Sequence, residues 1–191
     1  MKRVIVVGAG GHGRSVAEIL LASAECELVG FVDDAAKQLA NVWGLPVLAP
    51  VAALAECRSR AEAVVVAIGN NAVREAICAR LPAAGFELLS VIHSRAIVSP
   101  RAVIGPGCTI MPGAVVGTEA RLGTAVIVNS GSVVDHHCTI EDFAHIGTNA
   151  SMAGGSLLGR GAWMQAGSSL GYGVQVAAGQ TLAPGEGRAV R

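Results

Sequence analysis

Residues 103–140 read VIGPGCTIMPGAVVGTEARLGTAVIVNSGSVVDHHCTI and carry a repeat with a period of six. Steps of six from Val98 to Leu182 meet an aliphatic residue or methionine at all 15 positions. Four positions after most of them stands alanine, serine or cysteine. One large and one small side chain per hexad is typical of a β-helix with triangular coils, whereas an antiparallel sandwich predicts only a period of two. At three hexads per coil, the 15 hexads predict about five coils.

The first half of the chain follows a different pattern. Residues 1–96 hold 18 charged residues and 8 glycines, against 10 charged residues and 17 glycines in residues 97–191. Strand-like runs alternate with helix-like runs there, which predicts βαβ units around a parallel sheet. The expected strands are 3–7, 27–32, 63–68 and 86–92, and the expected helices are 14–23, 52–57 and 73–81. The sequence therefore predicts a Rossmann-like α/β domain over residues 1–95 and a left-handed parallel β-helix over residues 96–191.

Composition excludes several classes of protein. The net charge is 14 − 14 = 0, which argues against a general nucleic-acid binder or a protein bound to acidic membranes. Residues 161–185 are uncharged, but glycines interrupt them, so no membrane-spanning segment is expected. The start MKRVIVVGAGGHGR lacks the apolar core of a signal peptide. Five scattered cysteines without CxxC spacing suit reduced thiols, so we expect a cytoplasmic protein.

A glycine-rich loop, Gly8-Ala9-Gly10-Gly11-His12-Gly13, follows the first expected strand and opens a helix. Asp33 lies about 20 residues past Gly13, where an acid that binds a ribose would stand. Glycines let the backbone approach a pyrophosphate at a helix N-terminus. About 95 residues are too few for a two-half dinucleotide fold, so a nucleotide or nucleotide-sugar fits better. A tight turn without a ligand is the alternative, which His12 disfavours because a turn needs no imidazole.

Two adjacent histidines occupy one hexad, VVDHHC, in which Val134 and Cys138 point inward. His136 and His137 are therefore expected near a corner on the outer surface, and His145 follows nine positions after His136. An exposed imidazole that titrates near neutral pH is a credible general base. Simple solvent exposure is one alternative, and a zinc site built from three histidines is another. Because no third histidine follows at the spacing of one coil, no metal is expected.

Asn129 is polar inside the aliphatic stretch VIVNSGSVV, seven positions before His136. Asparagine at a β-helix corner is either structural or functional, and both interpretations remain open. Cys108 and Cys138 take small inward positions of the repeat, which predicts packing and not nucleophilic chemistry.

Taken in order, these motifs resemble one family over residues 1–185. They are the GxGGHG loop, Asp33-Asp34 at a strand end, the segment VIHSRA, the motif VxHHCxIxDFAHI and the hexapeptide repeat. The chain resembles the sugar acetyltransferases of the sialic-acid O-acetyltransferase type. Within them it is most similar to bacterial nucleotide-sugar N-acetyltransferases that act on 4-amino-4,6-dideoxyhexoses.

The resemblance implies roles for single residues. The residues that would hold the nucleotide-sugar are Gly10, Gly11, His12, Gly13, Asp33 and Asp34. The catalytic positions are His136, with Asn129 and His137 beside it. The residues that would contact acetyl-CoA are His145, Gly154 and Gly173. The resemblance also implies a homotrimer with active sites between neighbouring β-helices, and no metal.

Two features depart from the family pattern. The residue after the catalytic histidine is usually acidic, but here it is His137, which leaves Asp135, Glu141 and Asp142 as candidates to orient His136. Family members commonly carry a GxPAK-like motif that helps to cover the coenzyme, whereas this chain reads APGEGRAVR. A looser or differently built coenzyme site is therefore expected.

The resulting hypothesis is direct transfer of an acetyl group from acetyl-CoA to the 4-amino group of a nucleotide-linked sugar. His136 would take the proton from the amine, and the backbone N–H of Gly154 would stabilise the oxyanion. O-acetylation of a sialic acid or another sugar hydroxyl is one alternative. A noncatalytic protein that binds nucleotide-sugars is the other.

Overall fold

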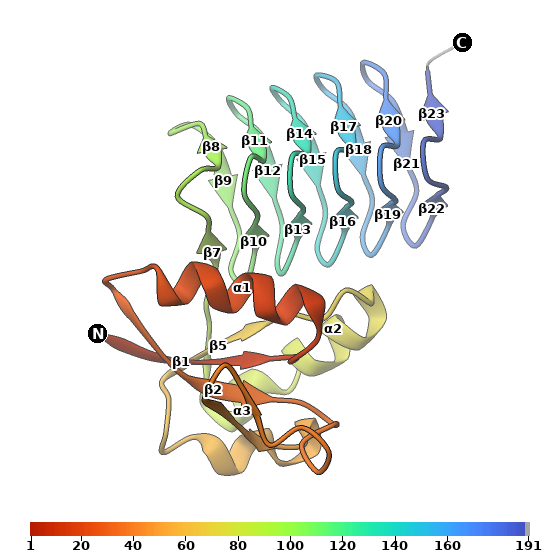
Figure 1. The fold of residues 1–191 in the computed structure, drawn as a ribbon. Helices are drawn as coiled ribbons and strands as arrows, with labels where there is room; N and C mark the ends of the chain where they lie inside the picture. The colour runs from red at the N-terminus through yellow and green to blue at the C-terminus, as the bar shows by residue number, and fades with distance from the viewer. Residues whose placement is uncertain (190–191) are drawn as a thin grey trace. The chain divides into compact units, whose positions relative to one another are not determined.

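The computed structural model describes residues 1–189 and divides the chain into two compact units, Met1–Val91 and Ile92–Arg191 (Figure 1). The sequence places its domain boundary at residues 95 and 96. Within residues 1–189 no helix is both long enough and apolar enough to cross a membrane.

The first unit is a six-stranded sheet in the order β3-β4-β2-β1-β5-β6. Its strands are β1 (Lys2–Val7), β2 (Cys26–Val32), β3 (Asn41–Val42), β4 (Leu45–Ala49), β5 (Ala63–Val66) and β6 (Glu87–Leu88). The helices are α1 (Gly11–Leu21), the 3-10 helix η1 (Val51–Cys57), α2 (Asn71–Cys78) and α3 (Leu81–Ala84). All neighbouring strands run parallel except β3, which is antiparallel to β4. The predicted Rossmann-like architecture is confirmed.

The structure differs from the sequence prediction at three places. The expected strand 86–92 is wrong as a single strand, because its two ends join different sheets. Leu89 donates its N–H to Val64 in the first unit, whereas His93 donates to Ile110 in the β-helix, and so β6 ends before β7 (Val91–Ile92) begins. The hairpin of β3 and β4 was missed, although Trp43-Gly44 forms its two-residue turn with both φ angles positive. Helix α1 also begins earlier than expected, directly after Gly10.

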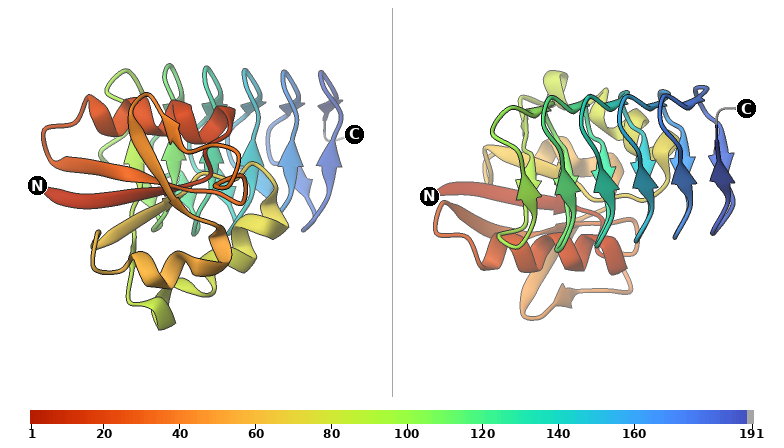
Figure 2. Two further views of the ribbon diagram at one scale, coloured as in Figure 1. Left: turned by 60° about the horizontal axis from the view of Figure 1, so that its bottom comes forward. Right: turned by 90° about the horizontal axis from the view of Figure 1, so that it is seen from above.

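The second unit is a left-handed parallel β-helix, which confirms the fold predicted from the hexads (Figure 2). Face 1 consists of β7, β10 (Thr109–Ile110), β13 (Ile127–Val128), β16 (His145–Ile146), β19 (Trp163–Met164) and β22 (Thr181–Leu182). Face 2 consists of β8 (Ile97–Val98), β11 (Val115–Val116), β14 (Val133–Val134), β17 (Ser151–Met152), β20 (Ser169–Leu170) and β23 (Gly187–Arg188). Face 3 consists of β9 (Val103–Ile104), β12 (Arg121–Leu122), β15 (Thr139–Ile140), β18 (Leu157–Leu158) and β21 (Gln175–Val176). Each strand pairs in parallel with the third strand after it, as Thr109 does with Ile127, so one coil consists of three hexads.

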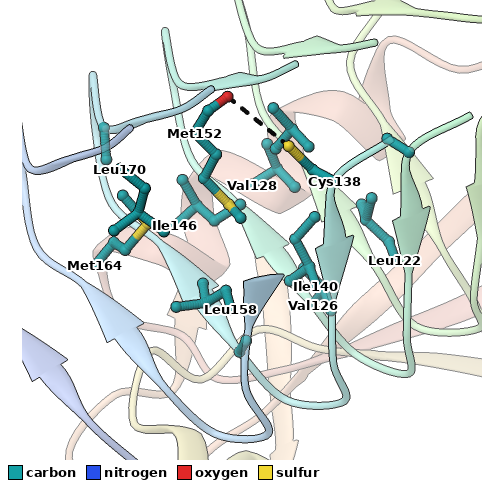
Figure 3. Packing of buried hydrophobic residues seen from close by; sticks show 14 of the residues in the cluster. Leu122, Val126, Val128, Cys138, Ile140, Ile146, Met152, Leu158, Met164 and Leu170 are labelled. Carbon is teal, nitrogen blue, oxygen red and sulfur yellow. Dashed lines mark hydrogen bonds between the residues drawn. The ribbon is translucent and has the colours of Figure 1, made fainter. Parts of the chain in front are cut away.

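The aliphatic positions of the repeat fill the core of the β-helix (Figure 3). From Ile110 to Leu182 every one of them is buried, whereas Val98 and Ile104 in the first coil are only partly buried. Apart from Ala102, which is only partly buried, the small positions are buried beside them. At one of these positions the thiol of Cys138 points inward toward the carbonyl oxygen of Met152. The inward pattern leaves the corners and outer faces to carry function.

Left-handed backbone conformations mark the corners at every sixth position from Gly107 to Gly185. Glycine occupies most of these positions, because it adopts a positive φ without steric cost. The exceptions are Glu119, Ala125, His137, Phe143 and Asn149. Glu119 and His137 are one coil apart, so they occupy the same corner, between face 2 and face 3, in consecutive coils.

Candidate active site

The corner between face 2 and face 3 gathers most of the reactive groups of the β-helix. It contains Glu119, the triplet 135–137, Gly154 and the segment 171–173, each reached by a step of about one coil. The side chains of Glu119, Asp135, His136 and His137 are each between 42% and 58% exposed. These groups are therefore open to a ligand while their backbone is fixed by the coils.

The ring of His136 lies on Gly154. A Cβ atom added to Gly154 would stand 2.5 Å from Nε2 and 2.9 Å from Nδ1 of His136, so only glycine leaves room for the imidazole there. The ring of Tyr172 lies beside it, with a distance of 6.3 Å between the ring centroids. Asp135 accepts the backbone N–H of His136 at 2.7 Å through Oδ1, and its Oδ2 lies 3.9 Å from Nε2.

The other ring nitrogen of His136 meets a second imidazole. Nδ1 of His136 lies 3.1 Å from Nδ1 of His137. Nε2 of His137 in turn lies 3.1 Å from Oε2 of Glu119. A carboxylate and two imidazoles therefore follow one another along this corner.

The two other candidates to orient His136 are engaged elsewhere. Glu141 accepts the backbone N–H of Arg160 at 2.7 Å. Asp142 accepts the N–H of Thr124 and the guanidinium of Arg160, and these hydrogen bonds hold the pKa of its carboxyl below the ordinary value. Both carboxylates stabilise contacts between coils.

Asn129 and His145 form a second group, associated with face 1. Asn129 Nδ2 lies 3.5 Å from Nε2 of His145, and the His145 ring stacks on Trp163 with a centroid distance of 5.5 Å. The carbonyl oxygen of the Asn129 side chain accepts the N–H of Ser130. In this chain Asn129 is therefore a neighbour of His145, at a different corner from His136, and the structure does not bring it to the two histidines.

Gly154 and Gly173 are brought together at the His136 corner, because the N–H of Gly173 donates to the carbonyl of Gly154 at 3.1 Å. Two of the residues expected to contact acetyl-CoA thus lie beside His136, and the third, His145, lies on face 1.

In the first unit, the four glycines of the GxGGHG loop have different surroundings. Gly8 has a φ of 108°, and a Cβ there would stand 2.7 Å from the carbonyl oxygen of Ala67. A Cβ on Gly13 would overlap the carbonyl oxygen of Gly8. At Gly10 and Gly11, by contrast, a Cβ would meet nothing within 4 Å. Gly8 and Gly13 are thus required by the fold, whereas Gly10 and Gly11 border open space at the N-terminus of α1.

The acidic pair that ends β2 is held by backbone N–H groups. Asp33 accepts the N–H of Ala9 at 2.7 Å and that of Ala35 at 2.8 Å, and this ties the glycine loop to the strand end. Asp34 accepts the N–H of Val51. Both border a cleft of about 300 Å³ beyond the ends of the parallel strands, which Ile68 and Arg80 also line. Ligands of α/β sheets characteristically bind at this edge.

His12 is largely buried at the start of α1. Burial, with a further contribution from the guanidinium of Arg74, lowers the pKa of His12 to about 4, so the imidazole is neutral at physiological pH. Arg74 is completely buried, and it donates to the carbonyl oxygen of Ile68 and to the side chain of Asn71, both at 2.8 Å.

Within residues 1–189 no cluster of three or more His, Cys, Asp or Glu side chains is arranged to hold a metal ion. The five cysteines are free thiols, and Cys108 and Cys138 are buried in the β-helix core. Burial raises the pKa of the Cys78 thiol to about 11.

Comparison with known proteins places this geometry in a family. The PglD N-terminal domain family matches residues 3–81. PerB from Caulobacter crescentus, solved in complex with CoA and GDP-perosamine, is 30% identical, with a TM-score of 0.85 over 98% of this chain and 91% of that one. The acetyltransferase domain of PglB from Neisseria gonorrhoeae FA1090, solved with acetyl coenzyme A, is 34% identical, with a TM-score of 0.78 over 99% of this chain and 96% of that one. The chain belongs to the nucleotide-amino-sugar N-acetyltransferases.

A curated relative agrees with this assignment. The UDP-N-acetylbacillosamine N-acetyltransferase of Bacillus subtilis (strain 168) is 34% identical over 103 residues, which are 52% of this chain and 46% of the relative. The match thus spans about half the length of that protein. The predicted family, the sugar N-acetyltransferases, is confirmed, and the relatives solved with CoA or acetyl coenzyme A agree with the predicted co-substrate.

For this N-acetyltransferase, sequence reasoning missed one residue of the His136 corner. Glu119 was not among the candidates to orient His136, yet it is the carboxylate that contacts His137. The signal was present in the repeat, because Glu119 precedes His137 by the length of one coil.

Proposed function

We propose that this N-acetyltransferase moves an acetyl group from acetyl-CoA to the 4-amino group of a nucleotide-linked amino-deoxysugar. The observation that carries the proposal is the half-exposed ring of His136, seated on Gly154 and contacted by His137 at Nδ1. A related protein supports the choice of substrates, because PerB was solved with both CoA and GDP-perosamine bound.

His136 is the general base of the proposed reaction. As the amine nitrogen attacks the thioester carbonyl, a C–N bond forms and Nε2 of His136 accepts the amine proton. The C–S bond then breaks, and the sulfur of CoA leaves with its electron pair and takes up the proton held on Nε2 of His136, which regenerates the base. The backbone N–H of Gly154, next to the imidazole, is the donor that would stabilise the oxyanion.

Transfer is proposed to be direct, without an acyl-enzyme. The cysteine nearest in sequence to His136 is Cys138, whose thiol is completely buried in the core and donates to the carbonyl oxygen of Ala153 at 3.3 Å. Acetyl-CoA alone should therefore release no stoichiometric burst of thiol, as measured by rapid mixing with a thiol reagent. A burst of one equivalent per chain would contradict direct transfer.

The first unit is the proposed site for the nucleotide-sugar. Gly10 and Gly11 leave the N-terminus of α1 open to a pyrophosphate, and a neutral His12 at the same terminus can hydrogen-bond a phosphate or sugar without carrying a charge. Asp33 and Asp34 border the adjoining cleft. Because the chain has no net charge, local N–H groups must supply most of the attraction for an anionic ligand.

Acetyl-CoA is proposed to contact His145, Gly154 and Gly173 in a homotrimer whose active sites lie between neighbouring β-helices. The supporting observation is that His145 lies on face 1, whereas the two glycines lie at the corner between face 2 and face 3. A second copy of the chain can present its face 1 to this corner and bring the two groups together. Light scattering should give the mass of three chains, and a catalytically active monomer would contradict the shared site.

The function is tested with a panel of nucleotide-linked amino-sugars. The protein is incubated with acetyl-CoA and each sugar, and thiol release and product mass are followed. Turnover with a 4-amino sugar, giving a product that resists hydroxylamine, is the expected result because an amide survives that treatment. A hydroxylamine-sensitive ester would favour O-acetylation instead, and acetyl-CoA binding without turnover on any sugar would favour a noncatalytic binder.

A further inference from the structure

We infer that Glu119 and His137 are positioning residues that set the tautomer of His136, so that its Nε2 is free to accept the amine proton. The inference rests on the proposed role of His136 as the base. It concerns two residues that do not themselves touch the reacting atoms in the proposed step.

The contact between the two imidazoles allows only two arrangements when both rings are neutral. Two Nδ1 atoms 3.1 Å apart share one hydrogen, so one nitrogen donates and the other accepts. If His136 donates from Nδ1, its Nε2 carries the lone pair that a base needs. If His137 donates instead, Nε2 of His136 carries a hydrogen and cannot accept a proton.

Glu119 selects between these arrangements. Its carboxylate, 3.1 Å from Nε2 of His137, accepts hydrogen bonds and cannot donate them when ionised. His137 must therefore carry its hydrogen on Nε2, which leaves the lone pair on its Nδ1. His136 then donates from Nδ1, and the lone pair of its Nε2 faces outward as the base.

The same contacts support the proton-transfer step. When Nε2 of His136 takes the amine proton, the ring becomes an imidazolium with its second N–H directed at His137. The positive charge then lies one imidazole away from the Glu119 carboxylate, and passage of the Nδ1 proton to His137 would bring it into direct contact with that carboxylate. No oxidant or further reactant is involved.

The other ionisable and aromatic neighbours of these rings act on different atoms. Asp135 is fixed by the backbone N–H of His136, and its second oxygen lies 3.9 Å from Nε2, on the reacting side of the ring. Tyr172 lies beside the ring of His136. Among residues 1–189, only the path through His137 to Glu119 addresses Nδ1.

The competing explanation is that Glu119 and His137 are side chains exposed to solvent that have no role in turnover. Glu119 and His137 are 55% and 58% exposed, and an exposed ion pair contributes little to stability. Under that explanation neither residue affects turnover. Under the proposed one, Glu119→Gln and His137→Asn each lower kcat by about 10- to 100-fold while KM for both substrates changes less than about threefold. Asparagine tolerates the positive φ of residue 137, so the second variant folds without added strain.

The path from Glu119 through His137 to Nδ1 of His136 is called the relay below. A double-variant experiment separates the effect of this relay from other effects of Glu119. His137→Glu places a carboxylate directly opposite Nδ1 of His136, which makes Glu119 redundant and adds repulsion between two acids. Glu119→Gln should therefore cost kcat in the parent protein, but cost nothing or restore activity in the His137→Glu background. Equal losses in both backgrounds, or no loss in either, would overturn the inference.

Glu141→Gln is the matched control, because it removes the same charge from the same β-helix at a carboxylate bonded to Arg160. Its kcat should stay within twofold of the parent value, and a loss as large as that of Glu119→Gln would overturn the inference. Nitrogen NMR of histidine-labelled protein gives a readout independent of activity. The parent should show His136 protonated at Nδ1, and Glu119→Gln should shift the ring toward the other tautomer.

The relay and the base can fail separately. If His136→Ala retains activity, the proposed base is wrong, and the relay falls with it. If His136→Ala is inactive while Glu119→Gln and His137→Asn turn over at the parent rate, the relay alone is wrong.

Discussion

Gly154→Ala tests whether the placement of the His136 ring controls turnover. The added Cβ would overlap Cε1 of the His136 ring and stand 2.5 Å from Nε2, whereas ordinary contact begins at 3.4 Å, so the ring must retreat by at least about 0.9 Å. The ring belongs to a half-exposed side chain and can move, and the backbone of residue 154 is not in the left-handed region. Stability should therefore change by less than about 1 kcal/mol.

A displacement of about 1 Å from productive geometry costs on the order of 10²-fold in rate. We therefore expect the kcat of Gly154→Ala to fall by about that factor, with an unchanged melting temperature. The assay is thiol release at saturating acetyl-CoA and nucleotide-sugar, paired with a thermal melt of the same preparation.

Gly155→Ala is the matched control at the next position. Gly155 has a φ of 68°, and its added Cβ would meet nothing within 4 Å. This variant should lose about 1 kcal/mol of stability through backbone strain, yet keep kcat within about threefold. Parent-like turnover in Gly154→Ala, or an equal loss in both variants, would refute the reasoning about the ring.

Four further variants test other parts of the chain. The lowered pKa of His12, about 4 against an unfolded value of 6.5, means that the unfolded state binds more protons between these pH values. Stability is then lost as pH falls through that window, by about 2 kcal/mol at pH 5. Urea unfolding of His12→Gln should lack this loss of stability at low pH. The same pH dependence in the variant and the parent would contradict the prediction. Gly13→Ala should destabilise the first unit by several kcal/mol, because its Cβ overlaps backbone. Gly11→Ala should melt normally but weaken nucleotide binding, and an unaffected nucleotide titration would argue against the loop as the binding site. Trp163→Leu should free the stacked ring of His145 and raise KM for acetyl-CoA but not for the sugar, and an effect on the sugar alone would place His145 elsewhere.

The β-helix was predictable because a period of six fixes which side chains face inward and which residues stack. The length of one coil also indicates which site residues share a corner. Gly154 follows His136 by one coil, and Gly173 follows His137 by two coils, so each pair shares a corner. Asn129 precedes His136 by little more than one hexad and therefore belongs to another corner. Resemblance alone groups Asn129 with His136, whereas the spacing within one chain places the two residues at different corners.

Other features depend on contacts that the sequence does not encode locally. The GxGGHG loop does not reveal that Gly8 and Gly13 are required by backbone packing whereas Gly10 and Gly11 are not. The break between β6 and β7 arises because neighbouring residues pair with different sheets. The link from Glu119 to His136 depends on side-chain rotamers at two corners where glycine is the usual residue.

The most direct test of the account is the turnover of His136→Ala, followed by thiol release with acetyl-CoA and a 4-amino nucleotide-sugar. The half-exposed ring is not part of the core, so the variant should fold and assemble like the parent protein. The account predicts a fall in kcat of about 10²- to 10⁴-fold, as expected for loss of a general base. A folded His136→Ala protein that retains most of its activity would contradict it.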